Sequence, residues 1–363
     1  MSREELQAFT SGLKNRIRKP DLTAAAEAKR RLDTIAKPLD SLGIFEEQLV
    51  RLAAAEGTAK LCISPARLVI FCADHGVVEE GVSQSGQEVS ALVAGSMARG
   101  RSSACRMAEA ESVELRIVNV GLACDVEEEA LTGRCIRKGT RNFAKESAMT
   151  QEECLTAIRC GMEEASLASE KGIRILLSGE MGIGNTCSSA ALASAMLGRD
   201  AAAMCGRGAG LSDEGLERKI LTIRRALKLH GFDTAVTSAE ETFRLLSCVG
   251  GYEIAAISGL CMGAALEGIP LILDGVITLA AALAAVRIFP ECSPWLLASH
   301  QGKEAATEGL LKALGLEAPI HAGLALGEGS GAVMGYALLR NVLSVYEEAA
   351  DFSELSMEAY HRL

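Results

Sequence analysis

Short apolar runs alternate with stretches of helical periodicity over most of the chain. The runs have the length of buried strands, and helical stretches such as 88–100 and 152–172 lie between them. Apolar strands that alternate with helices are typical of a parallel sheet covered on both faces. The pattern therefore predicts an α/β fold, with strands at 67–74, 114–122, 173–180, 270–275 and 295–300.

The first 60 residues differ from the rest because they contain only helical patterns, at 5–17, 22–36 and 41–57. Such amphipathic helices can pack as a small bundle. The longest apolar run, at 275–288, is rich in alanine and follows Asp274, so it predicts a buried helix rather than a membrane span. The polar start of the chain has no signal-peptide pattern, and we expect a cytoplasmic protein.

Composition narrows the classes of function. The 363 residues carry a formal net charge of -10, which argues against a nucleic-acid-binding surface but leaves room for a local anion site. The twelve cysteines are scattered singly, without metal-ligand spacing. We therefore expect buried free thiols in a reducing compartment and no metal site.

One stretch, 175–186, combines an apolar run with a glycine-rich turn and the start of a helical pattern. A strand followed by such a turn presents backbone N–H groups at the positive end of a helix, which favours an anion, usually a phosphate. The spacing of Gly179, Gly182 and Gly184 is neither a P-loop nor a dinucleotide fingerprint. A tight turn that needs glycine explains the pattern equally well.

Polar residues end several of the predicted strands, namely Asp74, Glu180, Asp274 and Ser299. The carboxyl ends of parallel strands meet at one edge of the sheet, so these residues predict a site there, although capping of turns and helices is the alternative. Glu328 lies between two glycines before a long apolar helix. By itself it fits a helix cap, a solvated residue or a catalytic carboxylate.

Several motifs together resemble one enzyme family. They are CADHGVVEEGVSQSGQEVS (72–90), SGEMGIGNT (178–186), CGRGAGLSDEGLERK (205–219) and LGEGSGA (326–332), with KPLDSLG (37–43), GGYEIAAISG (250–259), LILDGVITLAAAL (271–283) and the Ser299–His300 pair. Their order and spacing resemble the nicotinate mononucleotide:5,6-dimethylbenzimidazole phosphoribosyltransferases of cobalamin lower-ligand assembly. The resemblance runs from about residue 37 to the C-terminal helix.

The resemblance implies a Rossmann-like parallel-sheet domain at 61–332. It also implies a small helical domain built from residues 1–60 and the C-terminal helices at about 333–363. The implied reaction moves phosphoribose from nicotinate mononucleotide to an aromatic base, with inversion from β to α and release of nicotinate. The family needs no metal or organic cofactor and usually forms dimers, so we expect a homodimer or a heterodimer with a paralogue.

The resemblance also assigns roles to residues of this chain. The departing pyridine leaves as a neutral base, so one general base is enough, and Glu328 matches the family's catalytic glutamate. Glu180 matches a second carboxylate near the reacting centre, and two acids in one apolar cleft raise each other's pKa. The phosphoribosyl and nicotinate site is expected to use Gly182, Gly184, Asn185, Thr186, Gly206, Arg207, Gly208, Lys219, Asp274 and Ser299.

Two of these assignments have structural alternatives. Arg207 can instead form an ion pair with Asp213 or Glu214, and Asp274 can cap the helix that follows it rather than hold a ribose hydroxyl. His75 is expected to support the site through hydrogen bonds rather than to act as a base. The residues expected around the acceptor are Asp74, His75, Ser83, Gln87, Met181 and Leu326.

The chain departs from the family pattern near the acceptor. The family often has GVSxYPQEV, whereas this chain has GVSQSGQEV, and the family's RSAEPGH after the Ser–His pair is replaced by QGKEAAT at 301–307. Lys303 and Glu304 can replace part of what is lost. A benzimidazole, a purine, or a phenol such as p-cresol is each compatible with these changes, the last in a heteromeric enzyme.

Two rival functions remain to be distinguished from an active transferase. A catalytically weak partner subunit would bind the donor without turnover, but the chain retains both carboxylates. A nucleotide-binding dehydrogenase would need GxGxxG after the first strand and an acidic residue about 20 positions further on, and the chain lacks that pattern.

Overall fold

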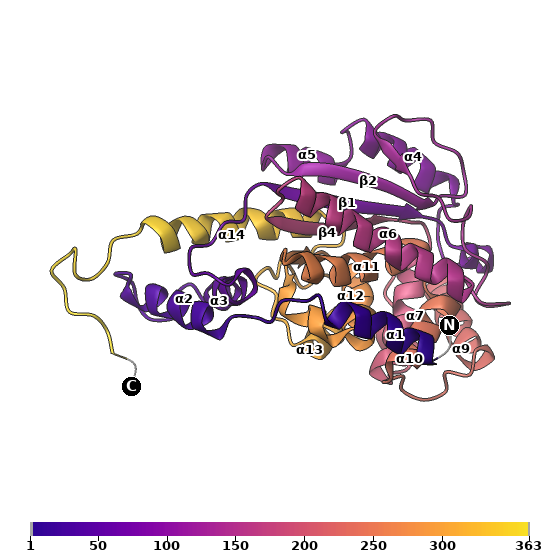
Figure 1. The fold of residues 1–363 in the computed structure, drawn as a ribbon. Coiled ribbons are helices and arrows are strands. Elements are labelled where there is room, and N and C mark those ends of the chain that lie inside the picture. Colours follow the sequence, from indigo (N-terminus) through magenta and orange to yellow (C-terminus); the bar gives the residue numbers. More distant parts are fainter. Residues whose placement is uncertain (1–2, 362–363) are drawn as a thin grey trace.

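A six-stranded parallel sheet runs through the computed structural model, which describes residues 3–361 (Figure 1). The strand order is β3-β2-β1-β4-β5-β6, so the order reverses between β1 and β4. The predicted α/β class is confirmed. The strands are β1 (Ala66–Ala73), β2 (Glu114–Gly121), β3 (Leu131–Gly133), β4 (Ile175–Met181), β5 (Leu271–Leu273) and β6 (Leu296–Ala298).

Each of the five predicted strands is present, and β3 is the strand that the sequence analysis did not identify. Its three residues, Leu-Thr-Gly, pair with Ile117, Val118 and Asn119 of β2 at the edge of the sheet. A run this short carries no apolar pattern of its own, so its strand conformation follows from pairing with β2 rather than from local sequence.

Alternate residues of β1 enter two different hydrophobic cores. Leu68, Ile70 and Cys72 belong to one core, whereas Val69 and Phe71 belong to the other. Side chains of a strand point alternately to the two faces, so a continuous apolar run predicts a sheet buried on both sides.

Helices cover both faces of the sheet (Figure 1). The core of one face includes residues of α2 (Leu22–Thr34), α3 (Ile44–Glu56), α4 (Glu88–Ala98), α5 (Ser103–Ala110) and α14 (Ser330–Glu348). The core of the other face includes residues of α1 (Arg3–Lys14), α6 (Gln151–Glu170), α7 (Asn185–Leu197), α8 (Ala201–Met204), α9 (Asp213–Leu229), α10 (Ala239–Val249), α11 (Tyr252–Glu267), α12 (Val276–Ile288) and α13 (Thr307–Leu314). Two 3₁₀ helices span Gly76–Glu80 and Pro290–Trp295.

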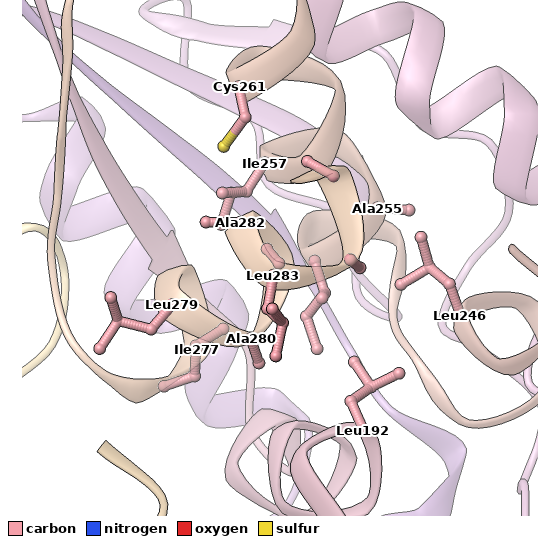
Figure 2. Packing of buried hydrophobic residues seen from close by; sticks show 14 of the residues in the cluster. Leu192, Leu246, Ala255, Ile257, Cys261, Ile277, Leu279, Ala280, Ala282 and Leu283 are labelled. Carbon is pink, nitrogen blue, oxygen red and sulfur yellow. The ribbon is translucent and has the colours of Figure 1, made fainter. Parts of the chain in front are cut away.

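Small residues bring the buried helices close together. A Cβ atom on Gly161 of α6 would lie 1.8 Å from the carbonyl oxygen of Ala256, and one on Gly259 of α11 would lie 1.9 Å from that of Ile158. Alanines and leucines of α12 pack against α7, α10 and α11 in the same core (Figure 2). The predicted buried helix at 275–288 is therefore confirmed. None of the helices over residues 3–361 is long and apolar enough to cross a membrane.

The C-terminal segment joins the N-terminal helices. Arg31 of α2 donates hydrogen bonds to the carbonyl oxygens of Tyr346 and Ala349, at 3.0 and 3.1 Å. Ile35 forms an antiparallel bridge with Asp351. Helix α1 packs on the opposite core through Leu6 and Leu13. The division into two domains stays a prediction.

The cysteines are free thiols, as expected. All are buried except Cys62, Cys124 and Cys135. Burial raises the pKa of the Cys205 thiol to about 11 and that of Cys187 to about 12, so these two side chains act as small apolar core residues.

Candidate functional site

The end of β4 opens into a cavity of about 280 Å³. It lies next to the point where the strand order reverses, which is where open α/β sheets bind ligands. A larger cavity, of about 610 Å³, lies among α2, α3 and residues 315–317, away from the glycine-rich turn. The predicted site residues that line the smaller cavity are Glu180, Met181, Gly182, Asn185, Thr186, Gly208, Asp274, Leu326 and Glu328.

The turn that carries Glu328 has three successive residues with positive φ. Gly327, Glu328 and Gly329 have φ values of 83°, 62° and 89°. A Cβ on Gly329 would lie 2.6 Å from Cδ1 of Leu68, and one on Gly179 would lie 2.6 Å from the carbonyl oxygen of Glu328. The left-handed conformation costs a non-glycine residue on the order of 1 kcal/mol. The glycines therefore let the turn rest directly on β4.

Glu180 and Glu328 come together across this contact. The backbone N–H of Glu328 donates to Oε1 of Glu180 at 3.4 Å, and the amide of Asn185 donates to Oε2. A Cβ on Gly327 would lie 2.7 Å from Oε1 of Glu180. The Glu328 carboxylate accepts a hydrogen bond from the Ala104 N–H at 3.2 Å, at the start of α5. Two carboxyl groups predicted from distant motifs thus share one site.

Burial raises the pKa of Glu180 to about 8, and the negative charges of Asp274 and Glu253 add to this shift. The hydrogen bonds from Glu328 and Asn185 oppose it. Glu180 is therefore mostly protonated at neutral pH, and a cationic group beside it would favour its ionised form.

Asp274 caps α14. Its carboxylate accepts hydrogen bonds from the N–H groups of Gly329 and Ala332, at 3.2 and 3.0 Å. Burial raises the pKa of Asp274 and lowers that of His300, while attraction between the two groups opposes both shifts. The helix that directly follows Asp274, α12, has no side-chain cap, so the predicted capping of that helix is not seen. Asp274 instead holds the Glu328 turn at the start of α14.

Lys219 is fully buried on α9 and directs its ammonium group toward the glycine-rich turns. Its Nζ donates to Oγ1 of Thr186 at 3.0 Å and to the carbonyl oxygen of Gly206 at 3.1 Å. No ion pair joins it to any residue in 3–361. A buried ammonium without a counter-charge is costly. Since it lies beside the N-terminus of α7, which has no side-chain cap, the arrangement favours an anionic ligand.

A carboxylate already lies against this loop. Oε1 of Glu304 accepts a hydrogen bond from the Gly208 N–H at 3.1 Å, and a Cβ on Gly206 would lie 2.0 Å from Oε2. Arg207 forms the alternative ion pair, with Asp213, and also donates to the carbonyl oxygen of Leu211 at 2.8 Å. Its guanidinium is half exposed and faces a second, smaller cavity of about 70 Å³ that Ser83 and Gly184 also line.

Six predicted residues line neither cavity: Asp74, His75, Gln87, Gly206, Lys219 and Ser299. Nε2 of His75 lies 2.5 Å from Oε1 of Glu253, and its Nδ1 lies 2.9 Å from Oγ of Ser188, all fully buried. Burial raises the pKa of Asp74. Its carboxylate accepts hydrogen bonds from the hydroxyl of Ser90 and the N–H of Ala123.

Apart from Lys219, which is described above, the remaining three members of this group also make hydrogen bonds behind the cavity wall. Nε2 of Gln87 donates to the carbonyl oxygen of His75 at 3.0 Å, and Oγ of Ser299 donates to that of Leu273 at 2.6 Å. Gly206 meets the site through its carbonyl oxygen, which Lys219 binds. The side chains of Gln87 and Ser299 therefore support the cavity wall rather than face a ligand.

Five further polar residues line the cavity and were not among the predicted site residues: Thr278, His300, Lys303, Glu304 and Thr307. The last four of them lie in or next to the stretch 301–307, where the chain departs from the family pattern. That departure was the signal that could have identified them.

Among residues 3–361, one acidic group has the spacing of a metal site, formed by Asp33, Asp40 and Glu46. Lys29 lies among them, 2.6 Å from Asp40 and 3.3 Å from Glu46, and Lys37 lies 2.6 Å from Glu46. The two ammonium groups already supply positive charge, so this group is an ion-pair network.

Known proteins similar to this chain share one description. A family model described as phosphoribosyltransferase matches residues 17–356. The nicotinate-nucleotide-dimethylbenzimidazole phosphoribosyltransferase of Ruminiclostridium cellulolyticum is 36% identical over 349 residues, which cover 96% of this chain and 98% of that protein. The protein of the same name from Pseudomonas putida is 39% identical over 339 residues, covering 93% and 95%. A crystal structure of CobT from Thermus thermophilus superposes with a TM-score of 0.86 at 36% identity, covering 93% of this chain and 99% of that one.

Proposed function

The chain belongs to the phosphoribosyltransferase family, and from this membership we propose that it transfers phosphoribose from nicotinate mononucleotide to 5,6-dimethylbenzimidazole. The products are nicotinate and an α-ribotide used in assembling the nucleotide loop of a cobamide. The observation that carries the proposal is the buried ammonium of Lys219, which forms no ion pair within 3–361, in the same site as the Glu180–Glu328 pair. It supplies an anion site next to two carboxyl groups.

The phosphate of the donor binds around Lys219. Its ammonium, the hydroxyl of Thr186 and the backbone at the start of α7 surround one region. Charge-assisted hydrogen bonds to a phosphate offset the burial of the ammonium. A Cβ on Gly208 would lie 3.0 Å from Oγ1 of Thr186, so this glycine keeps a side chain out of the region. Glu304 releases the Gly208 N–H when phosphate enters.

The bond that breaks joins C1 of the ribose to the pyridinium nitrogen. Its electron pair returns to the nitrogen, which leaves as neutral pyridine, so no general acid is needed. A nitrogen lone pair of the acceptor forms the new bond to C1 from the opposite face, which inverts β to α. The N–H proton of the acceptor then moves to a base.

Glu328 is that base. It projects from a rigid turn held by Asp274 and by close contact with β4, and it lines the cavity. Positioning of a base within hydrogen-bond reach of the proton is the main requirement of general base catalysis. Asp274 acts through this turn, as a positioning residue.

Glu180 faces the ribosyl cation that develops as the pyridine leaves. Its pKa of about 8 comes mainly from burial, and the positive charge of the pyridinium or of the ribosyl group shifts it toward the carboxylate. A preorganised charge in a dry cavity stabilises such a transition state.

The acceptor lies against Met181, Val93 and Leu326 at the cavity mouth. The Leu326 side chain is 52% exposed, so an apolar base would cover it. Ser83 lines the neighbouring cavity and adjusts that side. The names of the relatives specify dimethylbenzimidazole and give no support to a phenolic acceptor.

The test is to supply nicotinate mononucleotide with dimethylbenzimidazole, adenine, phenol or p-cresol in separate reactions. Mass spectrometry follows nicotinate release and identifies the ribotide. Turnover with dimethylbenzimidazole supports the proposal, whereas turnover with phenols alone contradicts it. The expected assembly, a homodimer or a heterodimer with a paralogue, is tested by light scattering of the purified chain.

A further inference from the structure

Lys303 places a positive charge in a cavity lined by acids. The acidic side chains that line it are Glu180, Asp274, Glu304 and Glu328. The basic ones are Lys303 and His300, and burial lowers the pKa of His300 while the nearby charge of Asp274 opposes that shift. Lys303 is exposed and forms no ion pair with another residue in 3–361. Its charge is therefore available to a ligand.

The backbone fixes where Lys303 stands relative to the reacting centre. His300 forms an isolated parallel β-bridge with Ile320. The Lys303 N–H donates a hydrogen bond to the carbonyl oxygen of Leu324 at 2.9 Å. From Leu324 the chain runs along the cavity to Glu328 in four residues. Lys303 thus lies on the cavity wall that ends at the proposed base.

A buried hydroxyl without a partner lies in the same wall. Thr307 is 1% exposed, and its Oγ1 has no hydrogen-bond partner among the described residues. A Cβ on Gly302 would lie 3.6 Å from this oxygen and 3.4 Å from Nε2 of His300. Both polar atoms therefore border the space that the glycine leaves open. An unpaired buried hydroxyl costs free energy, so this space favours a polar ligand group.

We propose that Lys303 and Thr307 form the subsite for the pyridine carboxylate of the donor, and that they select a nicotinate nucleotide over its amide. The inference rests on the proposed function, because that function supplies a donor with two anionic groups. Lys219 accounts for the phosphate. The carboxylate enters a cavity with four acids, where Lys303 provides the compensating charge and Thr307 a hydroxyl donor.

The subsite acts mainly on donor binding. The carboxylate is charged both before and after the glycosidic bond breaks, so its contact with Lys303 is similar in the ground and transition states. Interactions of this kind change KM more than kcat. Removal of Lys303 therefore raises KM for the nicotinate nucleotide and leaves the amide donor, which has no carboxylate, unchanged.

The experiment compares nicotinate mononucleotide with nicotinamide mononucleotide as donors for the wild-type chain, Lys303→Met, Lys303→Arg and Thr307→Val. Lys312→Met is the matched control, since Lys312 is an exposed lysine on α13 outside this cavity. We expect Lys303→Met to raise KM for the nicotinate nucleotide about 10-fold. Lys303→Arg should restore most of the loss, Thr307→Val should lose about threefold, and Lys312→Met should match the wild type.

Equal weakening of both donors by Lys303→Met would overturn the inference, because it would place Lys303 at the phosphate they share. An unchanged preference would overturn it as well. Direct titration of both nucleotides, without acceptor, separates this question from the proposed function. Absence of turnover in the wild type contradicts the transferase, whereas loss of the binding preference in Lys303→Met still supports the subsite.

Discussion

The N–H of Glu328 donates to the carboxyl group of Glu180 at 3.4 Å, joining a turn before the last long helix to the end of a central strand. The two residues are 148 positions apart. Three positive φ values and the missing side chain of Gly179 make this approach possible. The pairing explains why both motifs are rich in glycine and places both acids in one cavity.

Replacing Glu180 by glutamine should change how stability depends on pH. The folded-state pKa of about 8 lies above the usual value of 4.5, so the native state binds more protons between these pH values. Wild-type stability should therefore fall as pH rises from about 4.5 to about 8, by up to about 1.4 kcal/mol per pH unit. Glu180→Gln should lack this decline, and urea unfolding at pH 5, 7 and 9 measures it. Parallel pH profiles for the two proteins would contradict the assignment.

Replacing Lys219 by methionine should weaken donor binding while leaving the fold intact or more stable. The substitution removes a buried charge that has no counter-charge among residues 3–361, so its desolvation cost disappears. Loss of a charge-assisted contact to phosphate should raise KM for the donor roughly 10- to 100-fold. Thermal unfolding and donor titration check both parts. A lower Tm with unchanged affinity would show a purely structural lysine.

Replacing Glu304 by glutamine should strengthen donor binding. The Glu304 carboxylate accepts the Gly208 N–H that we assign to phosphate, and it repels a dianion nearby. Removing the charge should lower KM for the donor by about fivefold, corresponding to roughly 1 kcal/mol. The control is Glu308→Gln, an exposed acid on α13 outside the cavity. A higher KM in Glu304→Gln alone would indicate that the carboxylate orients the donor.

Replacing Gly329 by alanine should destabilise the chain by roughly 1–3 kcal/mol. An alanine at this position would have to adopt a φ near 89°, and its Cβ would lie 2.6 Å from Cδ1 of Leu68. Gly12→Ala is the control, because nothing lies within 4 Å of a Cβ there and α1 is helical. That control should gain about 0.5–1 kcal/mol. Similar unfolding curves for the two variants would mean that the turn is not constrained as described.

The sheet was predictable where a strand contains a continuous apolar run, as at 68–71 in β1 and 175–177 in β4. A strand that is buried on both faces needs apolar side chains on both of them, so its sequence shows a continuous apolar run. The three residues of β3 carry no comparable pattern, because pairing with β2 decides their conformation. The glycine-rich turns were predictable for a related reason, since few other residues adopt positive φ.

The site was predictable only in part. Motifs identified Glu180, Glu328 and Lys219, but they did not show that Asp74 and His75 turn away from the cavity. Their orientation depends on Ser90, Glu253 and other partners that only the tertiary structure brings together. Thr307 was missed because a threonine at the start of a helix usually satisfies local backbone groups. Here its hydroxyl has no partner among the described residues.

The most direct test of the account is the rate of nicotinate release from nicotinate mononucleotide and dimethylbenzimidazole, measured for the wild-type chain and Glu328→Gln side by side. Glutamine keeps an oxygen that can accept the Ala104 N–H but cannot take the acceptor's proton. We predict turnover in the wild type, and a kcat lower by roughly 100- to 10,000-fold in the variant with donor affinity retained. Equal rates in the two proteins would contradict the assignment of Glu328 as the base, and no release by the wild type would contradict the transferase itself.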